Sequence, residues 1–237
     1  GFGLTQKICE ELFEAGADAI TTGNHAWDQR EIIPFIDADH RVLRPLNYTG
    51  GTPGRGASVI KARDGRSVLV VNVMCRLFME LLDDPFAAVD GVLKSHPIGN
   101  AVDAVLIDVH GEATSEKMAL GHVCDGRASL VVGTHTHIPT ADAQVLPGGT
   151  AYQSDAGMCG DYDSVIGMKK ETAIAKFRTK IVTERLAPAR GPASLCGTYV
   201  ETDDATGLAA RVSPVVLGGR LHPAWPAFLP PRATAAE

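Results

Sequence analysis

The stretch that decides the fold is residues 128–137, Ala-Ser-Leu-Val-Val-Gly-Thr-His-Thr-His. Its apolar run predicts a short buried strand, and Gly133 follows just before two histidines. In an extended segment, residues i and i+2 point to the same side, so His135 and His137 are expected to present their imidazoles together. Neutral imidazole is a common ligand for transition metals; the alternative is that both rings hydrogen-bond within a loop.

Two further strands are predicted to end in polar side chains. Residues 18–22 lead to Asn24 and His25, and the buried strand 104–109 leads to His110. Ligands in open α/β sheets bind outside the carboxyl ends of the strands, so these side chains are expected to converge with the paired histidines. Taken singly, Asn24 also fits a turn or helix cap, and His110 fits an ordinary loop histidine.

The order of predicted elements indicates the fold class. Strands and helices alternate over the first two thirds of the chain, and antiparallel strands follow between residues 194 and 217. The helix over residues 5–15 is expected to bury Ile8, Leu12 and Ala15 on one face. Other helices are predicted at residues 29–36, 86–95, 115–120 and 170–178. We therefore expect a layered α/β fold with at least one mixed sheet.

Composition narrows the function classes. The 237 residues are 45% hydrophobic and carry a formal net charge of −6 with no long basic run, which argues against a nucleic-acid groove or an anionic membrane as main partner. The five cysteines form no CxxC motif, so free thiols in a reducing cytoplasm are expected. No apolar run is long enough for a membrane span, and no signal peptide is visible.

Three blocks of sequence carry a resemblance to a known family. They are residues 23–28 (Gly-Asn-His-Ala-Trp-Asp), residues 108–117 (Asp-Val-His-Gly-Glu-Ala-Thr-Ser-Glu-Lys) and residues 133–137 (Gly-Thr-His-Thr-His). Together they resemble the calcineurin-type metallophosphoesterases, most closely the YmdB-like bacterial branch of 2′,3′-cyclic nucleotide phosphodiesterases. The resemblance covers about residues 1 to 180 well and the remainder loosely. It implies a sandwich of mixed β-sheets flanked by helices.

The resemblance also implies a mechanism and a set of site residues. Asn24, His110 and His135 would bind one metal ion and His137 a second, with iron or manganese expected and zinc as a further candidate. A hydroxide generated by the two metals would attack the phosphorus of a small phosphodiester such as a 2′,3′-cyclic nucleotide. His25 would protonate the departing ribose oxygen as general acid. The resemblance further implies a homo-oligomer.

The sequence departs from the family pattern at its start. That pattern opens with a metal-binding Asp on a first strand, followed by a second strand ending in Asn-Gly-Glu-Asn, and neither is present here. We therefore expect one metallophosphoesterase domain over residues 1–237 that is N-terminally incomplete, with an irregular tail over 223–237. A non-catalytic metal- or nucleotide-binding regulator on the same scaffold, or an inactive truncated fragment, is the alternative function.

Several other residues have two interpretations. Three carboxylates could replace the missing metal ligands: Asp28, Asp108 and Glu112. We expect each of them instead to be exposed to solvent, to cap a helix or to hydrogen-bond a histidine. Arg127 is a phosphate clamp or, as we expect, part of a surface salt bridge. The remaining residues are expected to have no role in chemistry: Glu116 and Lys117 on a solvated helix face, Cys159 as an inert thiol, Trp27 in packing, and His40, His96, His122 and His222 at the surface or in loops.

Overall fold

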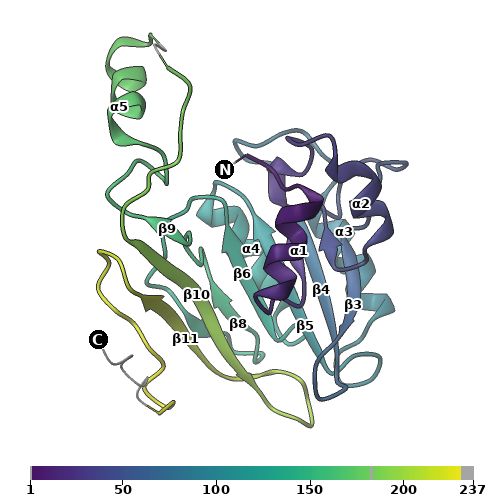
Figure 1. Cartoon of the computed structure of the whole chain (residues 1–237). Coiled ribbons are helices and arrows are strands. Elements are labelled where there is room, and N and C mark those ends of the chain that lie inside the picture. Colours follow the sequence, from purple (N-terminus) through teal and green to yellow (C-terminus); the bar gives the residue numbers. More distant parts are fainter. Residues whose placement is uncertain (1, 182–183, 231–237) are drawn as a thin grey trace.

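A six-stranded mixed sheet forms the centre of the molecule, with strand order β3-β4-β5-β6-β8-β7 (Figure 1). The computed structural model describes residues 2–181 and 184–230. Strands β4, β5, β6 and β8 are parallel, and β3 and β7 pair antiparallel at the two edges. The strands are β3 Ala57–Lys61, β4 Ser67–Met74, β5 Ala104–His110, β6 Leu130–Thr134, β7 Gln144–Val145 and β8 Ala151–Gln153.

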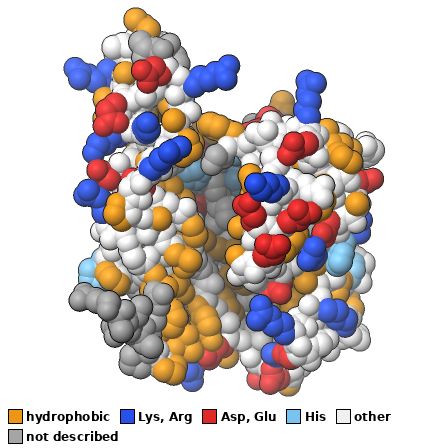
Figure 2. Space-filling view, viewed as in Figure 1, with side chains coloured by type: hydrophobic (Ala, Val, Ile, Leu, Met, Phe, Trp, Pro, Cys, Tyr) orange, Lys and Arg blue, Asp and Glu red, His pale blue; other side chains and the backbone are white. Residues whose placement is uncertain are grey.

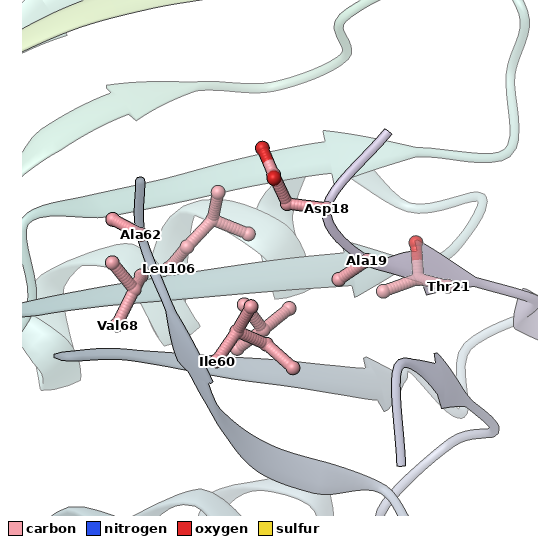
Figure 3. A pocket seen from close by; sticks show the side chains of 8 residues that line it. Asp18, Ala19, Thr21, Ile60, Ala62, Val68 and Leu106 are labelled. Atoms are coloured by element: carbon pink, nitrogen blue, oxygen red, sulfur yellow. The ribbon is translucent and has the colours of Figure 1, made fainter. Parts of the chain in front are cut away.

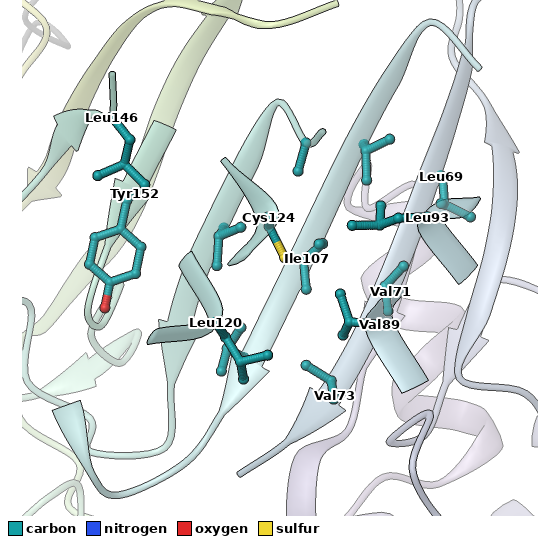
Figure 4. Packing of buried hydrophobic residues seen from close by; sticks show 14 of the residues in the cluster. Leu69, Val71, Val73, Val89, Leu93, Ile107, Leu120, Cys124, Leu146 and Tyr152 are labelled. Atoms are coloured by element: carbon teal, nitrogen blue, oxygen red, sulfur yellow. The ribbon is translucent and has the colours of Figure 1, made fainter. Parts of the chain in front are cut away.

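One face of this sheet is covered by helices α3, Pro85–Ser95, and α4, Thr114–Cys124. The core between them consists of alternate residues of β4 and β5, such as Val71 and Ile107, packed against Val89 of α3 and Leu120 of α4 (Figure 4). All four of these side chains are fully buried. Burial of this apolar surface is the main contribution that holds α3 and α4 on the sheet.

The opposite face carries two smaller sheets. One pairs β1, Ile20–Thr21, with β2, Val42–Leu43, and lies beside helices α1, Gln6–Glu14, and α2, Ile32–Ala38. The other consists of β9, Gly160–Asp161, β10, Ala193–Thr202, and β11, Ala209–Leu217. The layers confirm the predicted α/β sandwich of mixed sheets flanked by helices.

A hollow separates these two smaller sheets (Figure 2). Its apolar part is a cavity of about 370 Å³ between β1 and the central sheet, where Ala19 and Thr21 face Ile60, Val68 and Leu106 (Figure 3). The central sheet is therefore covered less completely on this face than on the face that carries α3 and α4.

The C-terminal third contains one element that stands away from the layers. Helix α5, Lys170–Thr179, projects beyond the end of β9 and β10 (Figure 1). After β11, the described residues 223–230 form no helix or strand apart from a bridge between Ala224 and Val216. Residues 231–237 of the predicted irregular tail lie outside the described residues.

The predicted buried face of α1 is wrong. Ile8 and Leu12 are 39% and 40% exposed, whereas Cys9 is fully buried and Phe13 packs beside it. Both stripes have helical spacing, and the position of the neighbouring α2 selects the one through Cys9. Thr5 caps this helix, since its hydroxyl accepts a hydrogen bond from the Ile8 amide at 3.2 Å.

Two other helix boundaries differ from prediction. The helix expected at residues 29–36 runs from Ile32 to Ala38 and contains Pro34 in its first turn, where a missing amide hydrogen costs little. The helix expected at 115–120 continues to Cys124. In the part of the chain that the structure describes, no helix is long and apolar enough to cross a membrane.

Candidate active site

The polar side chains that follow the predicted strands meet at one edge of the central sheet. In the parallel register, Met74 of β4 lies beside His110 of β5, and His110 lies beside Thr134 of β6. The short helix η1, Gly23–His25, follows β1 and brings Asn24 over the same edge. The structure thus brings together Asn24, His110 and His135, as the strand-end argument predicts.

Gly23 allows the η1 turn to lie directly against the ring of His110. Its φ of 60° lies in the left-handed region, and a Cβ atom there would overlap the imidazole ring of His110. The backbone amide of Gly23 donates to Oδ1 of the fully buried Asn72 at 3.2 Å, and the side-chain Nδ2 of Asn72 donates to Asp108 Oδ2 at 3.1 Å. Asn72 therefore ties the η1 turn to both β4 and β5.

A chain of hydrogen bonds sets the tautomer of His110. The Thr134 hydroxyl donates to Asp108 Oδ1 at 2.7 Å, so it can only accept from His110 Nδ1, which lies 2.9 Å away. Burial raises the pKa of the Asp108 carboxyl, and hydrogen bonds from Thr21 and Thr134 oppose that rise. With its hydrogen on Nδ1, the neutral ring of His110 presents the lone pair of Nε2 to the site.

Three electron-pair donors converge on this point. Asn24 Oδ1 lies 2.6 Å from His110 Nε2, and His135 Nδ1 lies 3.2 Å from the same atom. Glu112 Oε2, 3.4 Å from His135 Nε2, favours the tautomer that leaves a lone pair on Nδ1. Lone pairs that face one another repel unless a cation lies between them or the Asn24 amide rotates to present its nitrogen.

Burial makes the pKa of His110 unusually low. The pKa falls to about 3, first because the ring is desolvated and then because His135 lies beside it. The pKa of His135 is also lowered by burial, and Glu112 partly offsets that effect. Both rings are therefore neutral at pH 7, the form in which imidazole binds metals.

This low pKa predicts how stability depends on pH. Unfolded His110 titrates near its reference pKa of about 6.5, so between pH 6.5 and 3 the unfolded chain binds a proton that the folded chain does not. The stability that the folded state gains by keeping His110 neutral is fully present above pH 6.5 and is lost as the pH falls toward 3. In metal-free protein, the free energy of unfolding measured with urea should decline less steeply with falling pH in His110→Gln than in wild type. The two slopes should differ by at most about 1.4 kcal/mol per pH unit. Parallel curves would contradict the assignment.

His137 and His25 lie at the margin of this cluster. His137 Nδ1 donates to the Ile166 carbonyl at 2.8 Å, which leaves Nε2 with its lone pair, and the residue lines the same cavity as His110 and His135. His25 is half exposed beside Asn24 on η1, and its Nδ1 lies 2.7 Å from Asp28 Oδ2. Asp28 thus bonds a histidine, as expected.

The donor set fits one transition-metal ion better than two. His110 and His135 line a cavity of about 210 Å³, and Asn24 Oδ1 lies 2.6 Å from His110 Nε2, so two imidazole nitrogens and one amide oxygen lie close together. Over residues 2–181 and 184–230, no group of three or more His, Cys, Asp and Glu side chains is arranged to hold a metal. The carboxylates that line the cavity, Asp108 and Asp155, are already engaged with Thr134 and Lys117. A second ion would have His137 as its ligand among the described residues.

The structure overturns one interpretation of the surrounding residues. Glu116 and Lys117 were expected on a solvated helix face, yet they are 7% and 0% exposed. Glu116 accepts hydrogen bonds from the backbone amides of Arg76 and Leu77, and Lys117 pairs with Asp155. Both partners lie far away in the sequence, so the helical pattern alone carries no signal of this burial.

Other interpretations agree with the structure. Arg127 forms an ion pair with Asp90 at 2.8 Å near the surface. Trp27 packs against the cluster around Cys9, with its ring 6.2 Å from that of Tyr48. His40, His122 and His222 are exposed, and His96 is half-buried in the loop after α3. Cys159 is an exposed free thiol, and its inertness stays a prediction.

Comparison with known proteins assigns the family. The sequence model of the YmdB-like protein family matches residues 1–215 of this chain. The chain belongs to the YmdB-like protein family. It is 46% identical over 217 residues to the 2′,3′-cyclic-nucleotide 2′-phosphodiesterase of Bacillus subtilis (strain 168), covering 92% of this chain and 81% of that protein.

Two solved structures share the fold of this YmdB-like chain. A hypothetical protein from Thermus thermophilus superposes with a TM-score of 0.85 at 45% identity, over 93% of this chain and 84% of that one. A protein described as a novel phosphatase, from Mycoplasma pneumoniae, superposes with a TM-score of 0.82 at 30% identity, over 91% of this chain and 77% of that one. The resemblance stated from the sequence is confirmed, and the predicted class of phosphate-ester hydrolase agrees with these relatives.

Proposed function

We propose that this chain is a metal-dependent phosphodiesterase that hydrolyses 2′,3′-cyclic nucleotides. The observation that carries the proposal is the convergence of Asn24 Oδ1, His110 Nε2 and His135 Nδ1 at the carboxyl edge of the sheet. The substrate class follows from the Bacillus subtilis relative, which acts on these compounds. The chain's negative net charge is compatible with a phosphate substrate if metal ions supply the local positive charge.

The proposed ligands and their chemistry follow from the donor set. Asn24, His110 and His135 hold one ion, and His137 contributes to a second through Nε2; iron or manganese is the expected metal, with zinc as a further candidate. A divalent ion at these donors supplies positive charge for the phosphoryl oxygens and lowers the pKa of water bound to it. The buried bonds from Asp108 through Thr134 keep the His110 lone pair aimed at that ion.

We assign His25 the role of general acid. When a water oxygen bonds to phosphorus and releases one of its protons to solvent, the bond from phosphorus to the ribose 2′ oxygen breaks, and that oxygen takes a proton from His25 Nε2. The products are a 3′-phosphate monoester and a free 2′-hydroxyl. Asp28 Oδ2, 2.7 Å from Nδ1, orients the ring so that Nε2 is left free for the substrate.

A pair of substrates tests this role of His25. With added manganese, His25→Ala should lower kcat for 2′,3′-cyclic AMP by about 10²- to 10⁴-fold, since general acid catalysis contributes that much. Hydrolysis of bis-p-nitrophenyl phosphate should fall far less, because p-nitrophenolate leaves without a proton. Asp28→Asn, which keeps the ring bonded, should show a smaller loss. Equal losses on both substrates would contradict the general-acid role, and wild-type protein inactive on both would overturn the proposed function.

One observation favours the alternative of a non-catalytic metal- or nucleotide-binding regulator. In the described part of the chain, no three His, Cys, Asp or Glu side chains are grouped so that they could hold a metal ion. Elemental analysis of the purified protein separates the two functions. Two metal ions per chain support the enzyme, and one or none together with absent hydrolysis supports the regulator. Cytoplasmic location, expected from the cysteine pattern, and homo-oligomerisation, implied by the family resemblance, stay predictions.

A further inference from the structure

Lys117 is a buried charged residue that the proposed mechanism does not use. Its side chain is 0% exposed, and that of its partner Asp155 is 2% exposed. Lys117 Nζ lies 3.2 Å from Asp155 Oδ2 and donates at 3.2 Å to the backbone carbonyl of Thr134. It therefore links α4 to the end of β6, directly before the two paired histidines.

Asp155 extends this link into the histidine turn itself. Its Oδ2 accepts hydrogen bonds from the backbone amide of Thr136 at 3.0 Å and from the Thr136 hydroxyl at 2.8 Å. Its Oδ1 accepts from the Gly157 amide at 2.9 Å. Thr136 stands between His135 and His137, so one carboxylate anchors the residue that joins the two candidate ligands.

The backbone of this turn needs such an anchor. His135 and His137 have φ angles of 99° and 69°, in the left-handed region that side chains other than glycine rarely adopt. Residues in such conformations persist only where the surrounding structure holds them. The bonds from Lys117 and Asp155 to Thr134 and Thr136 provide that hold from inside the protein.

We propose that Lys117 and Asp155 form a positioning pair that holds His135 and His137 in the geometry of metal ligands. The inference rests on the proposed function, because it assigns the turn to a metal site. Neither residue is catalytic, since each acts through Thr134 or Thr136. Buried ion pairs contribute little net stability compared with apolar residues of similar size, so geometry is the better explanation for this pair.

Double variants test the inference in the whole chain, because either single change leaves an uncompensated buried charge. Lys117→Met with Asp155→Leu removes both charges and the acceptor for Thr136. Lys117→Met with Asp155→Asn removes both charges but keeps an oxygen acceptor. Lys94→Met is the matched control, since Lys94 forms an ion pair with Asp90 at 2.6 Å within α3 and its side chain is exposed.

Two measurements separate the inference from the proposed function. In metal-free protein, hydrogen exchange of the Thr136 amide should be at least tenfold faster in the leucine double variant than in wild type. Manganese titration should show about 10- to 100-fold weaker binding, as for other groups that orient metal ligands. The asparagine double variant should restore part of the amide protection and part of the manganese affinity, and Lys94→Met should match wild type in both measurements.

Different results would contradict the positioning role and the proposed function. Wild-type exchange and wild-type manganese affinity in a folded leucine double variant would overturn the positioning role. If that variant does not fold, the same result in the asparagine double variant would overturn it. If wild-type protein binds no manganese, the proposed function fails, and exchange at Thr136 alone decides whether the pair positions the turn.

Discussion

Replacing His110 with alanine is expected to lower kcat for 2′,3′-cyclic nucleotide hydrolysis by at least about 10³-fold. A metal ion contributes several kcal/mol of transition-state stabilisation, and each 1.4 kcal/mol corresponds to about tenfold in rate. His110 Nε2 is the atom that both Asn24 Oδ1 and His135 Nδ1 approach, at 2.6 and 3.2 Å. Its loss removes the centre of the candidate ligand set, so bound metal should be lost together with activity.

The measurement is steady-state hydrolysis together with elemental analysis of each purified protein. His222→Ala is the matched control, because His222 is exposed and its ring contacts the carbonyl of neighbouring Pro223. That variant should keep wild-type activity and metal content. A kcat for His110→Ala within tenfold of wild type, with unchanged metal, would place the metal site elsewhere in the protein.

The strand-end rule explains why much of this site could be predicted from the sequence. His110 and Thr134 lie in register because β5 and β6 are parallel, and parallel strands bring their carboxyl ends to one edge. Each apolar run is visible in the sequence, and the polar residue after it is therefore placed without any knowledge of distant contacts. The layered fold follows for the same reason, since the order of strands and helices determines it.

The parts that could not be predicted depend on contacts between distant residues. Lys117 has an ordinary helical neighbourhood, and its burial follows from Asp155, which lies 38 positions away. Asn72 lies within an apolar strand and is satisfied by Gly23 and Asp108 from two other elements. On α1, two stripes have equal helical spacing, and the tertiary structure selects the one that is buried.

Gly133 shows how closely the elements around the histidine turn are packed. It lies in β6, and its carbonyl accepts a hydrogen bond from the Ala156 amide at 2.9 Å. A Cβ atom at this position would overlap the backbone carbonyl of Ser154 and would lie 2.8 Å from Lys117 Cδ. Neither neighbour can move away easily, because one is backbone and the other belongs to a fully buried side chain.

Gly133→Ala is therefore expected to reduce the free energy of unfolding by about 3 kcal/mol or more, the upper range for added volume in a packed core. Gly91→Ala provides the matched control. Gly91 is in α3 with open space around its Cα, and the same substitution there should stabilise the protein by about 0.5–1 kcal/mol because alanine favours a helix. Urea unfolding followed by circular dichroism measures both. A loss below about 1 kcal/mol at Gly133 would mean that β6 and the Ser154 segment can separate, and the turn would then be less firmly held than the buried pair implies.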